Sequence, residues 1–344
     1  MKFQKTIIFQ LTKCYSLAPL QYHGESCFLV GAEKHDPSYL FHADGTVLAK
    51  VWDAPGGVMT MEQLPGTDGQ FLSTQEFYSP NNGKNARIVI AVPTEDRWDV
   101  RTLVDIPLVH RFGILSRGGV NYLLVCTIKN DYSERDDWRQ PGTVYAAVLP
   151  DDLSCFDAQH QLPLQPIMTG LWKNHGFSKY SDGGIQTALI GAQQGLFQFT
   201  PPAAPGESWN IRQLLDVPCS DAVMTDFDGD GLAEIGCMTP FHGDALQIFH
   251  KQADGTFAVC WRMPYRLEML HATWLCHLNG RPVWVVGCRG GVRQTLALYC
   301  ENGMYQTQII DADAGAANAL QISDNTLVCT NHAINEVALY TVCC

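Results

Sequence analysis

The fold of this protein is decided by the stretch TDFDGDGLAEIG, residues 225–236. Alternating aspartates, a turn glycine and a closing glutamate give it the spacing of an oxygen-rich loop around a hard cation such as calcium or magnesium. The predicted ligands are Asp226, Asp228, Asp230, the carbonyl of Leu232, and Glu234. The flanking segments SDAVMT and AEIGCM have the pattern of strands, whereas an EF-hand needs a helix on each side. We therefore expect a turn between two strands, with a candidate site for a structural cation.

The rest of the chain repeats short apolar runs separated by Gly, Asp and Asn turns, with almost no helical periodicity. Seven strand–loop–strand junctions recur, among them QTALIGAQQGLFQFT (186–200) and PVWVVGCRGGVRQTLALYC (282–300). Seven units of four strands predict an all-β fold, a seven-bladed β-propeller that spans residues 1–344 as one domain. The blades are expected to start near residues 23, 58, 110, 175, 221, 271 and 317.

The two ends of the chain complement each other in this interpretation. The last unit stops after its third strand, at Val342, and the chain begins with an unassigned strand, KTIIFQL, at residues 5–11. The N-terminal strand is therefore predicted to complete the last blade and close the ring, which removes the exposed edges of an open array.

Composition excludes several classes of partner. Lys and Arg number 23 and Asp and Glu 35, and the formal net charge of −12 argues against nucleic acid and anionic membranes as partners. No apolar run approaches the ~20 residues of a membrane span. The N-terminal segment MKFQKTIIFQLTKC has no apolar core of a secretory signal.

The 13 cysteines are dispersed without a CxxC motif, which favours the reducing cytoplasm. The oligomeric state is not predicted.

Residues 225–236 resemble the D-x-D-G-D-G-x-x-E/D-I signature of FG-GAP or VCBS-type propeller repeats, in which this loop joins the first two strands of a blade. The corresponding turns SRGGVN, YSDGGIQ, HLNGRP and ISDNT are degenerate versions of it. The resemblance implies that the acidic loop has a structural role, and that the chemistry lies elsewhere.

Propeller topology sorts the histidines. The segments before each first strand and between the second and third strands open on one face, opposite the acidic loop. Seven of the 11 histidines are assigned to that face: His23, His110, His175, His271, His35, His242 and His332. A single histidine near a strand end is usually structural, but imidazoles converging on one axis are typical ligands of a divalent transition metal such as Mn, Zn or Ni. The predicted ligands are His110, His175, His271, His242 and His332.

Other polar and aromatic residues are expected on the same face. The predicted catalytic residues, besides His110, His175 and His271, are Tyr180, Lys179 and Arg289. The predicted substrate-binding residues are Glu62, Gln63, Tyr78, Lys129, Trp138 and His35. Such groups suit a carbohydrate or small polyol, although an ordinary propeller rim has a similar composition.

The predicted propeller, with histidines lining its funnel, resembles the propeller of aldos-2-ulose (1,5-anhydrofructose) dehydratase. In architecture alone, it also resembles the metal-dependent propeller polysaccharide lyases. The resemblance implies a carbon–oxygen lyase or dehydratase that acts by metal- and His-assisted β-elimination on a sugar or an oxidised sugar of keto or uronyl type. One alternative is a non-catalytic propeller that binds a glycan or a protein. Another is a glycoside hydrolase with carboxylates paired among Glu62, Glu76 and Asp221.

Overall fold

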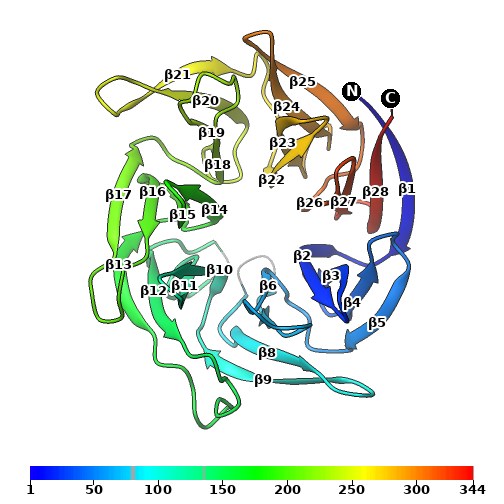
Figure 1. Ribbon diagram of the computed structural model, residues 1–344, viewed down its shortest axis with the longest axis vertical. Helices are drawn as coiled ribbons and strands as arrows, with labels where there is room; N and C mark the ends of the chain where they lie inside the picture. Colours follow the sequence, from blue (N-terminus) through cyan, green and yellow to red (C-terminus); the bar gives the residue numbers. More distant parts are fainter. Residues whose placement is uncertain (79–81, 135, 344) are drawn as a thin grey trace.

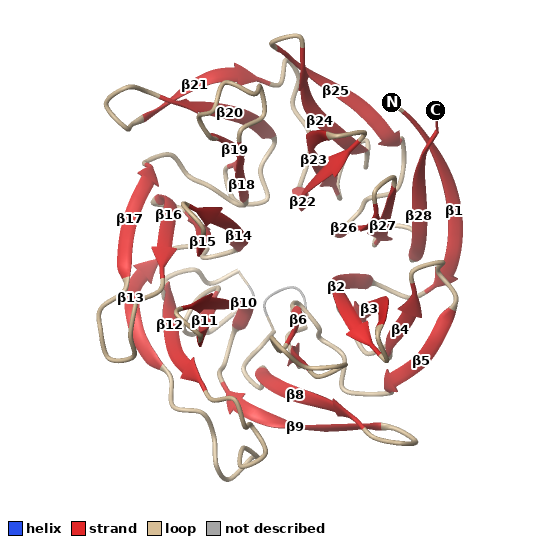
Figure 2. Ribbon diagram, viewed as in Figure 1, coloured by secondary structure: helices blue, strands red, loops and turns tan. Residues whose placement is uncertain are grey.

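The computed structural model describes residues 1–78, 82–134 and 136–343. Seven four-stranded antiparallel sheets are arranged around one axis (Figures 1 and 2). The described residues contain no helix, and so none that could cross a membrane. The chain is thus the predicted seven-bladed β-propeller.

Each blade runs outward from an innermost strand at the axis. From the axis outward, blade 1 contains β2 (Cys14–Tyr22), β3 (Glu25–Ala32), β4 (Ser38–His42) and β5 (Val47–Trp52). Blade 2 contains β6 (Met61–Gln63), β7 (Phe71–Gln75), β8 (Arg87–Pro93) and β9 (Trp98–Asp105). Blade 3 contains β10 (Val109–Arg117), β11 (Val120–Thr127), β12 (Gly142–Leu149) and β13 (Gln165–Leu171). Blade 4 contains β14 (Gly176–Asp182), β15 (Ile185–Ala192), β16 (Gly195–Thr200) and β17 (Asn210–Leu215). Blade 5 contains β18 (Ala222–Thr225), β19 (Glu234–Thr239), β20 (Ala245–Lys251) and β21 (Phe257–Arg262). Blade 6 contains β22 (Leu270–Leu278), β23 (Arg281–Cys288), β24 (Thr295–Glu301) and β25 (Met304–Asp311). Blade 7 contains β26 (Asn318–Ser323), β27 (Thr326–Asn331), β28 (Glu336–Cys343) and β1 (Lys2–Gln10).

The ring closes as predicted, because β1 pairs antiparallel with β28 and the two chain ends lie side by side (Figure 1). Lys5 reinforces the closure. Its Nζ lies 3.0 Å from Asp311 Oδ2 in blade 6 and 2.8 Å from Glu336 Oε2 in blade 7. One N-terminal side chain therefore ties the last two blades together.

The first blade starts earlier than expected. Its innermost strand begins at Cys14, whereas His23 lies in the turn between β2 and β3, on the face opposite the other candidate histidines. Pro19 lies within this strand, and a proline argues against a strand when only the sequence is considered. A proline is tolerated there because an innermost strand has one unpaired edge, which faces the axis. The other six first strands begin within three residues of the expected positions.

The core lies between the blades, because each sheet packs on a neighbour through both faces. The second strands are therefore almost continuously apolar: Leu123, Leu124 and Val125 of β11 are all fully buried. Cysteines in such strands, including Cys126 and Cys329, are buried free thiols, and burial raises their pKa. They behave as small apolar side chains.

Candidate active site at the propeller axis

The side chains at the axis come from one recurring position, the start of the innermost strand. Register shifts in β2, β10 and β22 leave Tyr15, His110 and His271 opposite no single partner residue. A β-bulge of this kind re-aims a side chain, and it does so at the same place in three blades. His175 and Asp221 stand immediately before β14 and β18. Five blades thus direct a polar side chain to one end of the axis.

His242 reaches the same place from the loop between β19 and β20. Its φ of 46° is left-handed, a conformation that is uncommon for a residue other than glycine. Its ring stacks on that of Phe241, with centroids 4.1 Å apart. His242 is partly exposed, whereas His175 and His271 are buried.

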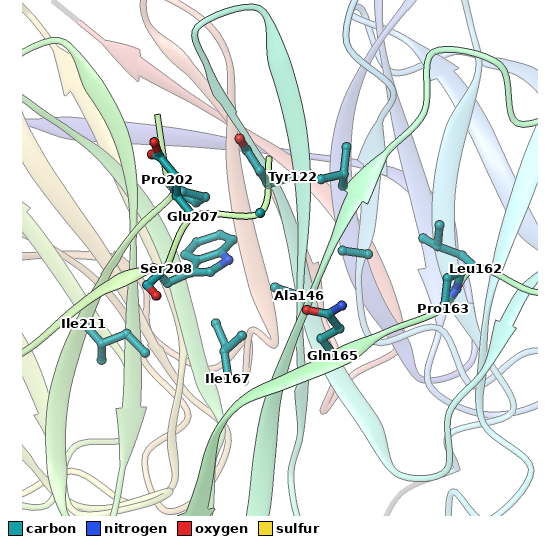
Figure 3. A pocket seen from close by; sticks show the side chains of 14 residues that line it. Tyr122, Ala146, Leu162, Pro163, Gln165, Ile167, Pro202, Glu207, Ser208 and Ile211 are labelled. Atoms are coloured by element: carbon teal, nitrogen blue, oxygen red, sulfur yellow. The ribbon is translucent and has the colours of Figure 1, made fainter. Parts of the chain in front are cut away.

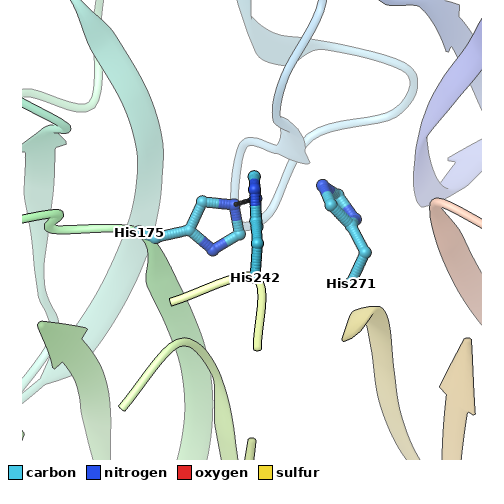
Figure 4. Close-up of side chains that lie close together, drawn as sticks. All are labelled: His175, His242 and His271. Carbon is cyan, nitrogen blue, oxygen red and sulfur yellow. Dashed lines mark hydrogen bonds between the residues drawn. The ribbon is translucent and has the colours of Figure 1, made fainter. Parts of the chain in front are cut away.

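Three imidazoles form a group that could hold a metal ion (Figure 4). The Nε2 atoms of His175 and His242 are 3.1 Å apart. The ring of His271 lies with its centroid 5.5 Å from that of His175 and 5.3 Å from that of His242. One ligand nitrogen from each ring lies within 4.8 Å of the others. We call His175, His242 and His271 the three-histidine group.

Hydrogen bonds orient two of these rings. Nδ1 of His271 lies 2.8 Å from the carbonyl oxygen of Ala317, which can only accept, so this nitrogen carries the proton. Nδ1 of His175 lies 2.9 Å from Asp221 Oδ2. Burial opposes the ionisation of Asp221, but His175 and then Arg111 outweigh it and hold its pKa below the usual value. Both rings therefore keep an Nε2 lone pair for a metal, the arrangement that outer carboxylates and carbonyls impose on metal-binding histidines.

The electrostatic setting favours the neutral form of the other ring, His242, and of His271. Burial holds the pKa values of His242 and His271 well below the usual range, and nearby cationic groups lower them further. Neutral imidazole is the form that coordinates a metal. His242 and His271 are thus held in the form in which imidazole could bind a transition metal.

His110 and His332, the other predicted metal ligands, lie outside this group. His110 is buried with its ring centroid 4.6 Å from that of His175, and its Nδ1 has no hydrogen-bond partner among the described residues. Burial holds its pKa well below the usual range. His332 instead approaches Glu33, with Nε2 and Oε2 2.6 Å apart, and Arg289 Nη2, at 2.9 Å.

Sequence reasoning missed Tyr15 and Arg111. The hydroxyl of Tyr15 lies 3.0 Å from His271 Nε2, and Arg111 Nη2 donates to that hydroxyl at 3.3 Å. The guanidinium carbons of Arg111 and Arg289 lie 5.6 Å and 5.7 Å from the centroid of the Tyr15 ring. Tyr15 occupies the same position in its blade as His110 and His271. The equivalence was missed because blade 1 was expected to start near His23.

An aromatic and cationic wall adjoins His242. The ring of Trp138 lies 5.4 Å from that of Phe241. Lys129 Nζ lies 4.5 Å from the Trp138 ring, and Lys173 Nζ lies 5.5 Å from that of Phe241. The predicted substrate-binding residues Trp138 and Lys129 therefore lie next to the three-histidine group through Phe241.

The remaining predicted polar residues bond to one another or to neighbouring strands. His35 and Tyr78 pack together, with ring centroids 4.6 Å apart. Lys179 and Glu62 form an ion pair between β14 and β6, and burial raises the pKa of Glu62. Gln63 bonds the backbone of Gln21 and so joins blades 1 and 2.

Tyr180, on the same strand as Lys179, has its pKa raised to about 12 by burial. The carboxylates considered for glycoside hydrolysis have separate partners. Glu62 pairs with Lys179, Glu76 with Arg87, and Asp221 with His175.

The acidic loop joins β18 to β19 and opens on the opposite face, as expected. Asp228, Asp230 and Glu234 are joined there by His250 of β20, whose Nε2 lies 2.9 Å from Asp230 Oδ2. Glu234 is fully buried, which raises its pKa to about 7, and its Oε1 has no hydrogen-bond partner among the described residues.

The other two predicted ligands of this loop are Asp226 and the carbonyl of Leu232, and Asp226 lies outside the group of Asp228, Asp230, Glu234 and His250. The carboxylate of Asp226 accepts from the backbone N–H groups of Gly229 and Gly231, at 2.6 Å and 2.9 Å. Leu232 has an exposed side chain, and its N–H donates to Asp230 at 2.7 Å. His250 was missed because it comes from a different strand.

A cavity of about 580 Å³ lies away from the axis, between blades 3 and 4 (Figure 3). Its lining includes Tyr122, Leu162, Ile167 and Trp209, and no histidine or cysteine. It therefore lacks the metal-binding chemistry of the axis.

No protein-family model matches the chain, and a comparison with curated proteins likewise finds no match. Function is therefore inferred from side-chain geometry.

Proposed function

We propose that this propeller is a metal-dependent carbon–oxygen lyase or dehydratase that acts by β-elimination on a sugar or an oxidised sugar at the axial site. The observation that carries the proposal is the convergence of His175, His242 and His271, two of them oriented by an outer hydrogen-bond acceptor. We assign the acidic loop of blade 5 to an FG-GAP or VCBS-type repeat with a structural calcium or magnesium ion, and the protein to the cytoplasm, where its thiols stay reduced.

The residues present fit a divalent transition metal such as Mn, Zn or Ni. Imidazole nitrogen suits these metals, and three protein ligands leave coordination positions open for substrate. When bound, the metal would polarise a substrate carbonyl and stabilise the negative charge that develops on its oxygen.

Tyr15 and His110 are the groups placed to move protons. The hydroxyl of Tyr15 donates to His271 Nε2, and it would lose this acceptor if that nitrogen held a metal. His110 is buried and neutral, with an Nδ1 that has no partner among the described residues. In the elimination, one group takes the proton from the carbon next to the carbonyl. The other gives a proton to the departing oxygen, and the electrons of the C–H bond become the new C=C bond.

The wall formed by Trp138, Phe241 and Lys173 would hold the sugar ring. Aromatic faces bind the apolar faces of sugars and exclude water, while the lysine supplies a polar contact. The same wall would serve a non-catalytic propeller that only binds a glycan, which is the second candidate function.

Turnover separates these two candidates. β-Elimination next to a carbonyl creates a conjugated double bond, so the purified protein should generate ultraviolet absorbance from uronate- or keto-sugar substrates. Chelation, and the triple variant H175A/H242A/H271A, should abolish this signal. His160→Ala is the matched control, because His160 is exposed and, among the described residues, bonds within its own loop to Asp157. A metal-free protein, or turnover that persists in the triple variant, would overturn the proposal.

A further inference from the structure

Arg111 stands out at the axial site because the groups that accept its hydrogen bonds are neutral, and Asp221 acts on its charge only from beyond ion-pair distance. The residue is only 9% exposed, and no carboxylate of the described residues lies within ion-pair distance of its guanidinium. Its bonds are to the carbonyl oxygen of Met59, at 2.5 Å, and to the hydroxyl of Tyr15, at 3.3 Å. Since a guanidinium has five N–H donors, these two bonds leave three available.

A buried lysine can lose its proton and become neutral, whereas an arginine keeps its positive charge. A buried charge without a partner is costly, so the site gains when an anion arrives. The nearby carboxylates already have partners. Asp221 accepts from Ser220 Oγ and pairs with His175, and Glu33 pairs with His332 and Arg289.

The formal charge of the site points the same way. Arg111 and Arg289 balance Glu33 and Asp221, and an imidazole that binds a metal does so as a neutral ligand. A divalent metal on the three-histidine group would therefore leave a net charge of about +2, by simple addition of formal charges. This local excess occurs in a chain whose overall charge is −12, so it is a property of the site and not of the whole protein.

We infer that Arg111 binds a carboxylate of the substrate, and that the substrate class is an anionic sugar, a uronate or another sugar acid, and not a neutral sugar. The binding of a carboxylate by Arg111 is independent of the proposed function, and only the reaction that follows binding rests on it. The planar guanidinium matches a carboxylate with two parallel hydrogen bonds. A carboxylate held there lies beside the Tyr15 hydroxyl, so the carbon next to it is presented to a group that can move a proton.

The test is binding of D-glucuronate and D-glucose, which differ in a carboxylate, to the metal-loaded full chain by calorimetry. We expect glucuronate to bind about 10- to 100-fold more tightly, the range for hydrogen bonds to charged groups. Arg111→Met should remove this preference, and Arg111→Lys should restore part of it. Arg117→Met is the matched control, because Arg117 lies at the other end of β10 and bonds the carbonyl oxygen of Pro201.

The inference is overturned if the two sugars bind equally, if neither binds, or if Arg111→Met leaves the glucuronate affinity unchanged while the variant unfolds at the wild-type temperature. The outcome is separable from that of the proposed function. A glucuronate preference that depends on Arg111, without turnover, supports the anion site and removes the lyase. Turnover of a neutral sugar by Arg111→Met supports the lyase and removes the anion site.

Discussion

The hydroxyl of Tyr15 and Nε2 of His271 lie 3.0 Å apart, although the two residues are separated by 256 positions in the sequence. The proton on His271 Nδ1 is fixed by Ala317, so the tyrosine donates to the lone pair that a metal would use. A metal bound at Nε2 would therefore compete with this hydrogen bond and would free the phenol.

Replacing Tyr15 by phenylalanine should separate metal binding from catalysis. Metal affinity should be retained or rise slightly, because the competing donor is gone. Turnover should fall about 10²- to 10⁴-fold, the usual contribution of a positioned acid or base. Metal titration and rate measurements check both parts, with Tyr22→Phe at the far end of β2 as control. A loss of metal affinity as large as that of His271→Ala would contradict this account.

Asp221→Asn should weaken metal binding without removing any ligand. The carboxylate holds the Nδ1 proton of His175, and losing such an outer partner typically costs about 10- to 100-fold in affinity. Competition with a coloured chelator measures the change. The control is Asp244→Asn, which breaks an ion pair with the exposed Arg266. Equal affinities of Asp221→Asn and wild type would show that Asp221 does not orient the ligand.

Cation binding at the acidic loop should depend on pH near neutrality. Burial raises the pKa of Glu234 from 4.5 to about 7, so below that pH the folded protein keeps it protonated and unable to coordinate a cation. The rise in melting temperature caused by calcium should therefore increase as the pH passes upward through about 7. In chelator the sign reverses, because the raised pKa stabilises the fold at low pH and this contribution is lost as the pH rises through about 7.

The measurement is thermal unfolding between about pH 5 and pH 8, with calcium or with chelator. Glu234→Gln should abolish both trends, whereas Asp254→Asn, in an exposed turn of the same blade, should keep them. A calcium effect that is the same at every pH would count against Glu234 as a ligand.

Lys5→Met should weaken the ring closure. Lys5 bridges Asp311 and Glu336, both of which are mostly buried, so its loss leaves two carboxylates without their cation. We expect a loss of about 1–2 kcal/mol in the free energy of unfolding. Lys50→Met, which removes an exposed pair with Asp53, should change it by less than about 0.5 kcal/mol. Similar small losses in both variants would show that the closure depends on strand pairing alone.

Much of the fold could be predicted from the sequence because propeller blades repeat local signals, namely apolar runs, turn glycines and one acidic loop. The start of blade 1 could not, since Pro19 interrupts the strand pattern of β2 and moved the expected start to His23. That single error hid Tyr15.

The histidines were sorted to the correct face except His23, because loop order alone decides the face. Their grouping was not predictable. It depends on the bulge that directs His271 to the axis and on the left-handed backbone that brings His242 there from a loop. Arg111 contacts Tyr15, and His250 contacts Asp230, across different strands. A linear motif does not show such contacts.

The central claim is tested most directly by the metal content of the purified protein, measured by mass spectrometry of the elements. The account predicts one equivalent of Mn, Zn or Ni in wild type and in His160→Ala, and none in the folded triple variant H175A/H242A/H271A. A folded wild-type protein without transition metal after incubation with these ions, or a triple variant that keeps a full equivalent, would contradict it.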